Sequence, residues 1–304
     1  MGCWKLVGGG GVTPRGYPLI GIALAGLLSA SVHAADSDAE RGAYLVAAGG
    51  CGNCHTDRDK DGAALAGGLA LETPFGTFYT PNITPDPETG IGQWTEAGLA
   101  QALRQGISPQ GDHYYPAFPY TSYTGMSDQD VADMWAHLQT VTPVSQPNRP
   151  HLLPWYLEYR PLLWGWKLLN FDQLDPPPQA PTGPPETRGS YLVEHVAHCG
   201  ECHTPRNRLG GLRRDLWLAG NKDGPEGDAV PNITPHREDG IGRWSTSDIE
   251  YYLEVGMDPG GDFVGGAMTE VVDHSTAMLS ADDRAAIASY LKSIPALPSI
   301  EPAQ

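Results

Sequence analysis

The sequence predicts an all-α protein made of two tandem copies of one small helical module. The pentapeptide Cys51-Gly52-Asn53-Cys54-His55 returns as Cys199-Gly200-Glu201-Cys202-His203, and Pro81–Pro85 returns as Pro231–Pro235 in the same order. Matching segments in a constant order indicate an internal duplication, and strand signals are weak throughout. The expected organisation is a signal peptide over 1–34, a first domain over 35–145, a linker over 146–185, a second domain over 186–297 and a tail over 298–304.

Helix signals around each pentapeptide support the all-α prediction. Residues 37–38 can cap a first helix that leads into the first pentapeptide, and Thr95 begins a further helix that Gly106 ends. Ser127 and Ser280 are expected to begin the terminal helices, because each is followed after two residues by an aspartate. That pattern resembles a capping box, although the box prefers glutamate or glutamine at its last position.

The N-terminus reads as a secretory signal. Lys5 and Arg15 supply sparse positive charge, an apolar run extends over 17–31, and Val32-His33-Ala34 resembles a small-residue cleavage site. The apolar run is too short for a comfortable membrane span. We therefore expect cleavage and export to the periplasm, with an uncleaved membrane anchor as the alternative.

The chain is strongly acidic. It carries 19 lysines and arginines against 36 aspartates and glutamates, a net charge of -17, and loss of the signal peptide would remove two further positive charges. Nucleic acid is therefore excluded as a partner, because its phosphates attract basic proteins. An acidic surface favours a basic patch on a protein partner, although it also serves solubility alone.

The repeated pentapeptide has the Cys-x-x-Cys-His spacing of a covalent haem c site. Two thiols one helical turn apart can add to the haem vinyl groups, and the adjacent histidine becomes the proximal iron ligand. The sequence thus predicts two covalently bound haem c groups. Cys3 lies within the signal peptide, so no cysteine is left for a disulfide. A structural zinc site and a redox dithiol are the alternatives.

Further segments carry a family resemblance. Asn82-Ile83-Thr84-Pro85, Gly90-Ile91-Gly92-Gln93-Trp94 and Thr204-Pro205-Arg206-Asn207 resemble the cytochrome c subunits of periplasmic alcohol, aldehyde, gluconate and molybdenum-hydroxylase dehydrogenases. Both modules resemble class I cytochrome c domains, over nearly all of the mature chain. The resemblance implies two crossed helices beside each haem, and a periplasmic dehydrogenase as electron donor. Such subunits commonly carry three haem motifs, whereas this chain has two.

The sixth iron ligand of the second haem is expected to be Met268. Electron-transfer haems usually bind a methionine sulfur opposite the histidine, which raises the potential and leaves no open position. Met268 lies between Asp262 and the cap at Ser280, where such a ligand is sought. His274 is the second choice, while Met278 fits the core or the surface better.

The first module offers no methionine at the matching position, where Phe118 stands instead. Met126, directly before the Ser127 cap, is the expected ligand if its shorter loop folds back. His113 is the second choice, and would lower the potential of this haem. An open iron is the third, and would permit catalysis.

Supporting roles near the haems follow from donor chemistry. Trp94, Trp244 and Arg206 are candidates to bind haem propionates, because indole and guanidinium N–H groups suit a carboxylate; the tryptophans would equally fill a core. By resemblance to class I domains, the carbonyl that accepts the second ring N–H of each proximal histidine is expected near Pro85 or Pro235.

The linker combines proline runs with a Trp-rich and Leu-rich stretch over 152–171 that is too interrupted to span a membrane. It is expected to be a strap across both modules. Contact with a dehydrogenase or a membrane surface is the alternative.

Two functions from different classes fit these residues. The first is a periplasmic electron-transfer subunit, not itself an enzyme, that passes electrons from a dehydrogenase to a quinone, a cytochrome or an oxidase. The second is a dihaem enzyme of the peroxidase or thiosulfate-oxidising type with a catalytic first haem. Phe118 is the best support for the second. Against it, the only acid-base candidates that the sequence offers beside that site are His113, Tyr114 and Tyr115, which make no convincing constellation.

Overall fold

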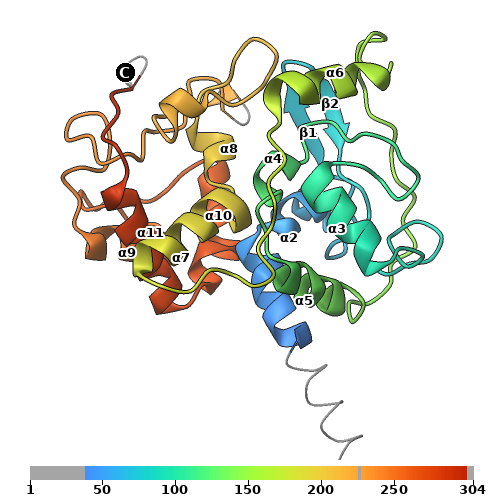
Figure 1. The fold of residues 1–304 in the computed structure, drawn as a ribbon, viewed down its shortest axis with the longest axis horizontal. Coiled ribbons are helices and arrows are strands. Elements are labelled where there is room, and N and C mark those ends of the chain that lie inside the picture. The colour runs from blue at the N-terminus through green and yellow to red at the C-terminus, as the bar shows by residue number, and fades with distance from the viewer. Residues whose placement is uncertain (1–37, 225–226, 300–304) are drawn as a thin grey trace, which may run out of the picture. The chain divides into compact units, whose positions relative to one another are not determined.

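A computed structural model describes residues 38–224 and 227–299 (Figure 1). The predicted signal peptide over 1–34 and the end of the predicted tail lie outside the described residues. Within the described part, no helix is both long and apolar enough to cross a bilayer.

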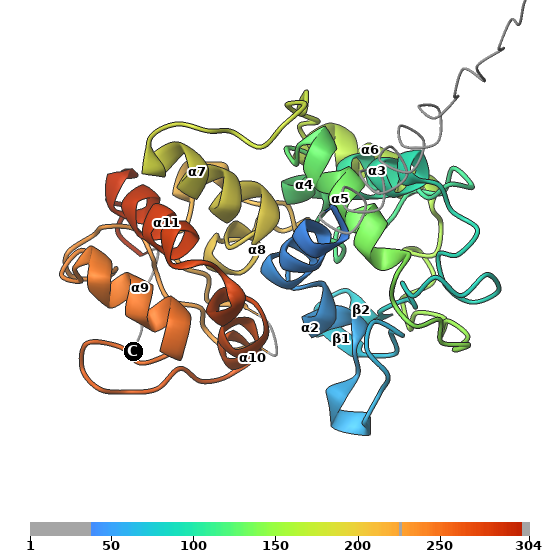
Figure 2. The same cartoon turned by 90° about the horizontal axis from the view of Figure 1, so that it is seen from below.

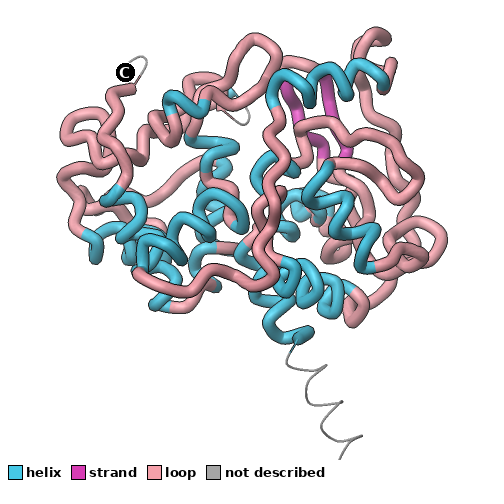
Figure 3. The backbone as a smooth tube through the Cα atoms, viewed as in Figure 1, coloured by secondary structure: helices cyan, strands magenta, loops and turns pink. Residues whose placement is uncertain are grey.

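The described chain is mostly helical, with long loops between short helices (Figure 3). Its first part begins with a helix over 38–48 and continues with α2 (Cys51–His55), η1 (Arg58–Lys60), β1 (Ala70–Thr73), β2 (Gly76–Tyr79), α3 (Glu96–Gln105), α4 (Tyr120–Tyr123), α5 (Asp128–Leu138) and α6 (Pro161–Asn170). It then continues with α7 (Pro185–Tyr191), η2 (Leu192–Val196), α8 (Gly200–His203), η3 (Arg214–Leu216), α9 (Thr246–Val255), α10 (Ala267–His274), η5 (Thr276–Met278) and α11 (Ala281–Ser293).

The helix ends predicted for α3 are confirmed. The Thr95 hydroxyl accepts a hydrogen bond from the Gly98 amide, and Gly106 ends the helix in the left-handed conformation at φ 60°. The hairpin of β1 and β2 was not predicted. Its four-residue strands are too short to show an alternating pattern, and Thr77 exchanges backbone hydrogen bonds with Leu152 of the linker.

A glycine stands where the first and last helices of each copy cross. A Cβ atom on Gly42 would lie 1.9 Å from the carbonyl oxygen of Asp133 in α5, and one on Gly189 of α7 would lie 2.0 Å from that of Ala286 in α11. Any larger residue would push the two helix backbones apart. The same crossing therefore occurs in both copies, as a duplicated module requires.

We expect Gly189→Ala to destabilise the protein by several kcal/mol, because the methyl group overlaps the backbone of α11. Gly165→Ala is the matched control, since a Cβ atom there meets no other atom within 4 Å in the middle of α6. It should stabilise the protein by about 0.5–1 kcal/mol. Equal denaturation midpoints for the two variants would contradict the tight crossing.

One apolar core extends through both copies. Leu45, Met126 and Met134 from the first copy share a buried cluster with Leu192 and Ile287 from the second. The described residues, 38–224 and 227–299, accordingly form one compact unit. The tandem domain boundaries at 145 and 186 remain predictions from the repeat.

The terminal helices begin as predicted, but their aspartates are used differently. The Ser280 hydroxyl accepts a hydrogen bond from the Asp283 amide at 3.1 Å. In a capping box the Asp283 carboxylate would return to the Ser280 amide. Instead the Tyr44 hydroxyl lies between them, accepting from the Ser280 amide at 3.2 Å and donating to the Asp283 carboxylate at 2.6 Å. A tyrosine of the first copy thus completes the cap of α11.

The opposite tyrosine makes the equivalent bridge to the first copy. The Tyr191 hydroxyl accepts from the Ser127 amide at 3.0 Å and donates to the Asp130 carboxylate. Burial raises the pKa of Asp130, and the hydrogen bond from Tyr191 opposes this rise. Each copy therefore completes a helix start in the other.

Tyr191→Phe removes a hydroxyl that serves both a buried amide and a buried carboxylate. We expect a loss of about 1.5–3 kcal/mol in the free energy of unfolding, the usual worth of a hydrogen bond to a charged group. Tyr251→Phe, at a site 45% exposed, should change stability by less than about 0.5 kcal/mol. Denaturant unfolding of the two variants compares them, and an unchanged midpoint for Tyr191→Phe would refute the bridge.

The linker helix α6 contacts both copies, as the strap interpretation expects. The Lys167 ammonium donates to the carbonyls of Gln105 and Gly106 at the end of α3, and the Trp166 indole donates to the Leu209 carbonyl of the second copy. Burial lowers the pKa of Lys167 to about 8. The outer face of α6 stays apolar and exposed, with Leu169 at 73%.

Candidate haem sites

Both pentapeptides fold into a short helical turn, α2 and α8, with their cysteines one turn apart. All four cysteines are free thiols. Burial raises the pKa of Cys51 and of Cys199 to about 12. Both thiols are therefore protonated at neutral pH. In the part of the chain that is described, no three His, Cys, Asp or Glu side chains converge as a metal site.

Each pentapeptide histidine is fixed by a backbone carbonyl. His55 Nδ1 lies 2.7 Å from the carbonyl oxygen of Pro81, and His203 Nδ1 lies 2.8 Å from that of Pro231. A carbonyl only accepts, so Nδ1 carries the hydrogen and Nε2 presents its lone pair for iron. Burial lowers the pKa of both imidazoles, which keeps them in this neutral form. The acceptor is the first proline of each Pro-Asn-Ile-Thr-Pro segment, four residues before the expected Pro85 and Pro235.

Two asparagines that the sequence reading left without a role hold these carbonyl loops. The Asn232 side-chain oxygen accepts from the Thr234 amide, and its NH2 group donates to the Leu297 carbonyl at 2.8 Å. Asn82 makes the equivalent bonds to Thr84 and Val144. The repeated Asn-x-Thr tripeptide was the available signal. Each loop is thereby tied to the chain that follows its terminal helix.

The structure separates the candidates for the first distal ligand. Met126 is 1% exposed, in the same core cluster against which Cys51 and Trp94 pack. The Arg104 guanidinium donates to its carbonyl at 3.0 Å. His113 lies beside the linker instead; burial lowers its pKa and the nearby charge of Lys167 lowers it further. These surroundings favour Met126, which remains a prediction.

In the second copy, Met268 lies half-buried in the first turn of α10. His274, on the same helix, has Nε2 3.5 Å from the Glu270 carboxylate, and Met278 is 57% exposed. At the matching place of the first copy Phe118 packs on Tyr114 and Tyr123. The shorter loop there leaves only the single turn of α4 where the second copy has α10. The two distal sides therefore differ in architecture.

The predicted propionate ligands are placed as follows. Trp94 and Trp244 are half-buried against the core. The Arg206 guanidinium donates to the Glu201 carboxylate at 2.6 Å and to the Gly210 carbonyl at 2.8 Å. Burial alone would raise the pKa of Glu201, but the charge of Arg206 and the hydrogen bonds from Thr121, Arg206 and Ser122 together outweigh burial, so the pKa is lowered. Arg206 thus binds a side chain of the second pentapeptide directly. Contact with a haem propionate remains a prediction for Trp94, Trp244 and Arg206.

The first pentapeptide lies against the second copy. The Asn53 NH2 group donates to the Ser275 hydroxyl at 3.0 Å, and α10 packs beside α2 (Figure 2). Burial raises the pKa of Cys202 to about 11, and the neighbouring Cys54 adds to that rise. The thiols, the oriented imidazoles and the buried thioether of Met126 suit covalently held haem c.

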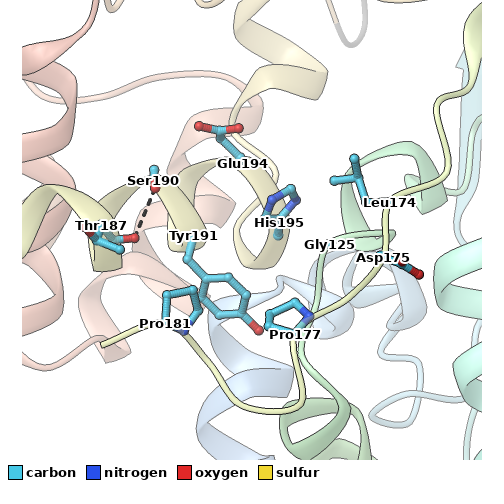
Figure 4. Close-up of a pocket in the computed structure, with 10 residues that line it drawn as sticks. All are labelled: Gly125, Leu174, Asp175, Pro177, Pro181, Thr187, Ser190, Tyr191, Glu194 and His195. Atoms are coloured by element: carbon cyan, nitrogen blue, oxygen red, sulfur yellow. Dashed lines mark hydrogen bonds between the residues drawn. The ribbon is translucent and has the colours of Figure 1, made fainter. Parts of the chain in front are cut away.

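A cavity of about 280 Å³ lies where the linker passes α7. Figure 4 shows Tyr191 and His195 directed toward it, with Pro177 and Pro181 of the linker opposite. No pentapeptide residue lines it. The cavity is therefore a feature of the interface between copies, separate from the haem sites.

These features define a c-type cytochrome. The cytochrome c family model matches residues 39–142. The chain is 49% identical over 267 residues to "Diheme cytochrome c-type" of Cereibacter sphaeroides, covering 86% of this chain and 87% of that protein. It therefore belongs to the dihaem branch of the cytochrome c family.

Two longer relatives are dehydrogenase subunits. The gluconate 2-dehydrogenase cytochrome c subunit of Pantoea cypripedii is 40% identical over 85% of this chain and 60% of its own length. The cytochrome c subunit of alcohol dehydrogenase (quinone) from Gluconobacter oxydans is 38% identical over 90% of this chain and 59% of its own. The chain thus spans about three fifths of each. The similarity supports electron transfer beside a dehydrogenase rather than catalysis.

Cys199→Ala/Cys202→Ala should reduce covalent haem from two groups to one per chain, because the second pentapeptide loses both attachment points. Cys51→Ala/Cys54→Ala should do the same at the first. Intact mass and haem absorbance per chain measure the loss. Full haem content in either variant would contradict the assignment.

Proposed function

We propose that this chain is a periplasmic dihaem cytochrome c that accepts electrons from a dehydrogenase and passes them to a quinone, a cytochrome or an oxidase. The observation that carries the proposal is the pairing of the two haem motifs within one compact unit. Haem c supplies one-electron oxidation and reduction. Two such groups bound within one compact unit would make a relay rather than two independent carriers.

The protein residues have definite tasks in this relay. Pro81 and Pro231 fix the tautomer of the proximal histidines, which tunes their basicity toward iron. Met126 and Met268 are the residues that would bind the two irons on the side opposite the histidines and would leave no open position there. The buried core around Met126 keeps water from that side of the first site, and exclusion of water is a further control of potential.

The donor is inferred from the relatives that are dehydrogenase subunits. The name of one of them includes quinone, which makes a quinone the first acceptor to test. The acidic net charge of -17 suits a partner with a basic docking patch. The exposed apolar side chains of the linker are also suited to contact with a membrane surface.

Carbon monoxide tests the relay, because it binds only an iron with an open or weakly held sixth position. We expect the reduced protein to keep its spectrum under carbon monoxide, and the oxidised protein to show the near-infrared band of methionine-bound haem at both sites. Ready binding at one haem would favour the dihaem enzyme instead. A missing band without carbon monoxide binding would identify His113 as the first distal ligand.

A further inference from the structure

Each haem motif extends one side chain onto the other copy. In the first motif, the Asn53 NH2 group donates to the Ser275 hydroxyl. In the second motif, the Ser122 hydroxyl donates to the Glu201 carboxylate at 2.8 Å. Ser122 and Ser275 hold equivalent places, each five residues before the serine that caps the terminal helix. The contact is thus duplicated, but one of its two forms is neutral and the other is charged.

The charged form is the more extensive. Besides Ser122, the Glu201 carboxylate accepts from the Thr121 hydroxyl at 2.6 Å and from the Arg206 guanidinium at 2.6 Å. Its side chain is only 8% exposed. A buried carboxylate is tolerated where donors surround it. Glu201 thus ties α4 of the first copy to α8 of the second.

Other second-copy residues hold the same segment. His195 Nδ1 donates to the Ser122 carbonyl at 3.0 Å, and the ring leaves no space for a Cβ atom on Gly125. The His198 and Tyr123 rings are T-shaped to each other, with their centroids 5.4 Å apart. Residues 120–126 are therefore held from the second copy along most of their length, and Met126 ends the segment.

From this geometry we infer that Glu201 is a positioning residue for the first haem. It holds residues 120–126 against the second haem motif, so that Met126 stays on the distal side of the first iron. The inference rests on the proposed function in taking Met126 as a ligand. Phe118 occupies the place where the second copy has its methionine, so the first copy must supply its ligand from a short segment that needs outside support.

The second copy needs no such support. Met268 lies on α10, whose eight residues form a helix with its own backbone hydrogen bonds, whereas α4 has four residues. The first copy contacts this part of the second copy through the neutral hydrogen bond from Asn53 to Ser275 and through a half-exposed ion pair between Arg58 and Glu270. Neither contact buries a charge, whereas α4 is held by the buried Glu201 carboxylate.

The test compares Glu201→Ala with Thr121→Val/Ser122→Ala, which removes the hydroxyl bonds without changing the second motif. Glu238→Ala is the control, because it removes the same charge from an exposed loop position. In the full-length protein carrying both haems, Glu201→Ala and Thr121→Val/Ser122→Ala should each lose roughly half of the methionine–iron band. Either should also bind carbon monoxide at one haem per chain when reduced. Glu238→Ala should match the parent protein.

A protein that carries all three substitutions should be little less stable than either variant alone, since both variants break the same contact. Full band intensity and no carbon monoxide binding in folded Glu201→Ala would overturn the inference, as would additive shifts in denaturation midpoint. If the parent protein itself binds carbon monoxide, the relay proposal fails on its own. The midpoints of single and combined variants still decide whether Glu201 holds this segment.

Discussion

The structure depends on a tyrosine hydroxyl shared between the two copies of the module. Tyr44 and Tyr191 each accept from the amide that begins the other copy's terminal helix, and each donates to a carboxylate one turn further on. A capping box would satisfy the same groups within one helix. Because each cap is instead completed by the other copy, these contacts fix the orientation of the two helix pairs relative to each other. The haem sites inherit their mutual placement from these contacts.

Much of the site could be predicted from the sequence because covalent haem attachment needs fixed residues at fixed spacing. The cysteines and histidines, the cap at Thr95 and the left-handed Gly106 all depend on local chemistry. The roles of Asp130 and Asp283 could not be predicted, since their partners are distant in the chain. The same holds for Glu201, whose pentapeptide position gave no hint of Thr121 and Ser122. The hairpin was missed because its register relies on the linker.

Duplication has not kept the two sites equal. Gly42 and Gly189 show that the helix crossing is preserved in both copies. The imidazole of each pentapeptide also bonds the equivalent carbonyl in its own copy. Divergence is concentrated on the distal side, where one copy has a two-turn helix and the other a single turn. Because distal surroundings set potential more freely than the attachment site does, we expect haems bound at the two sites to differ in potential.

The shared tyrosines also bear on how the chain is made. Synthesis runs from the N-terminus, and Tyr191 follows Asp130 by 61 residues. Until that stretch emerges, the first terminal helix lacks its outside cap, and the Asp130 carboxylate lacks its donor. The first copy therefore reaches its final form only after the second has begun to fold. A chain cut short between the copies would carry an incomplete helix start, a defect that cellular proteases can recognise.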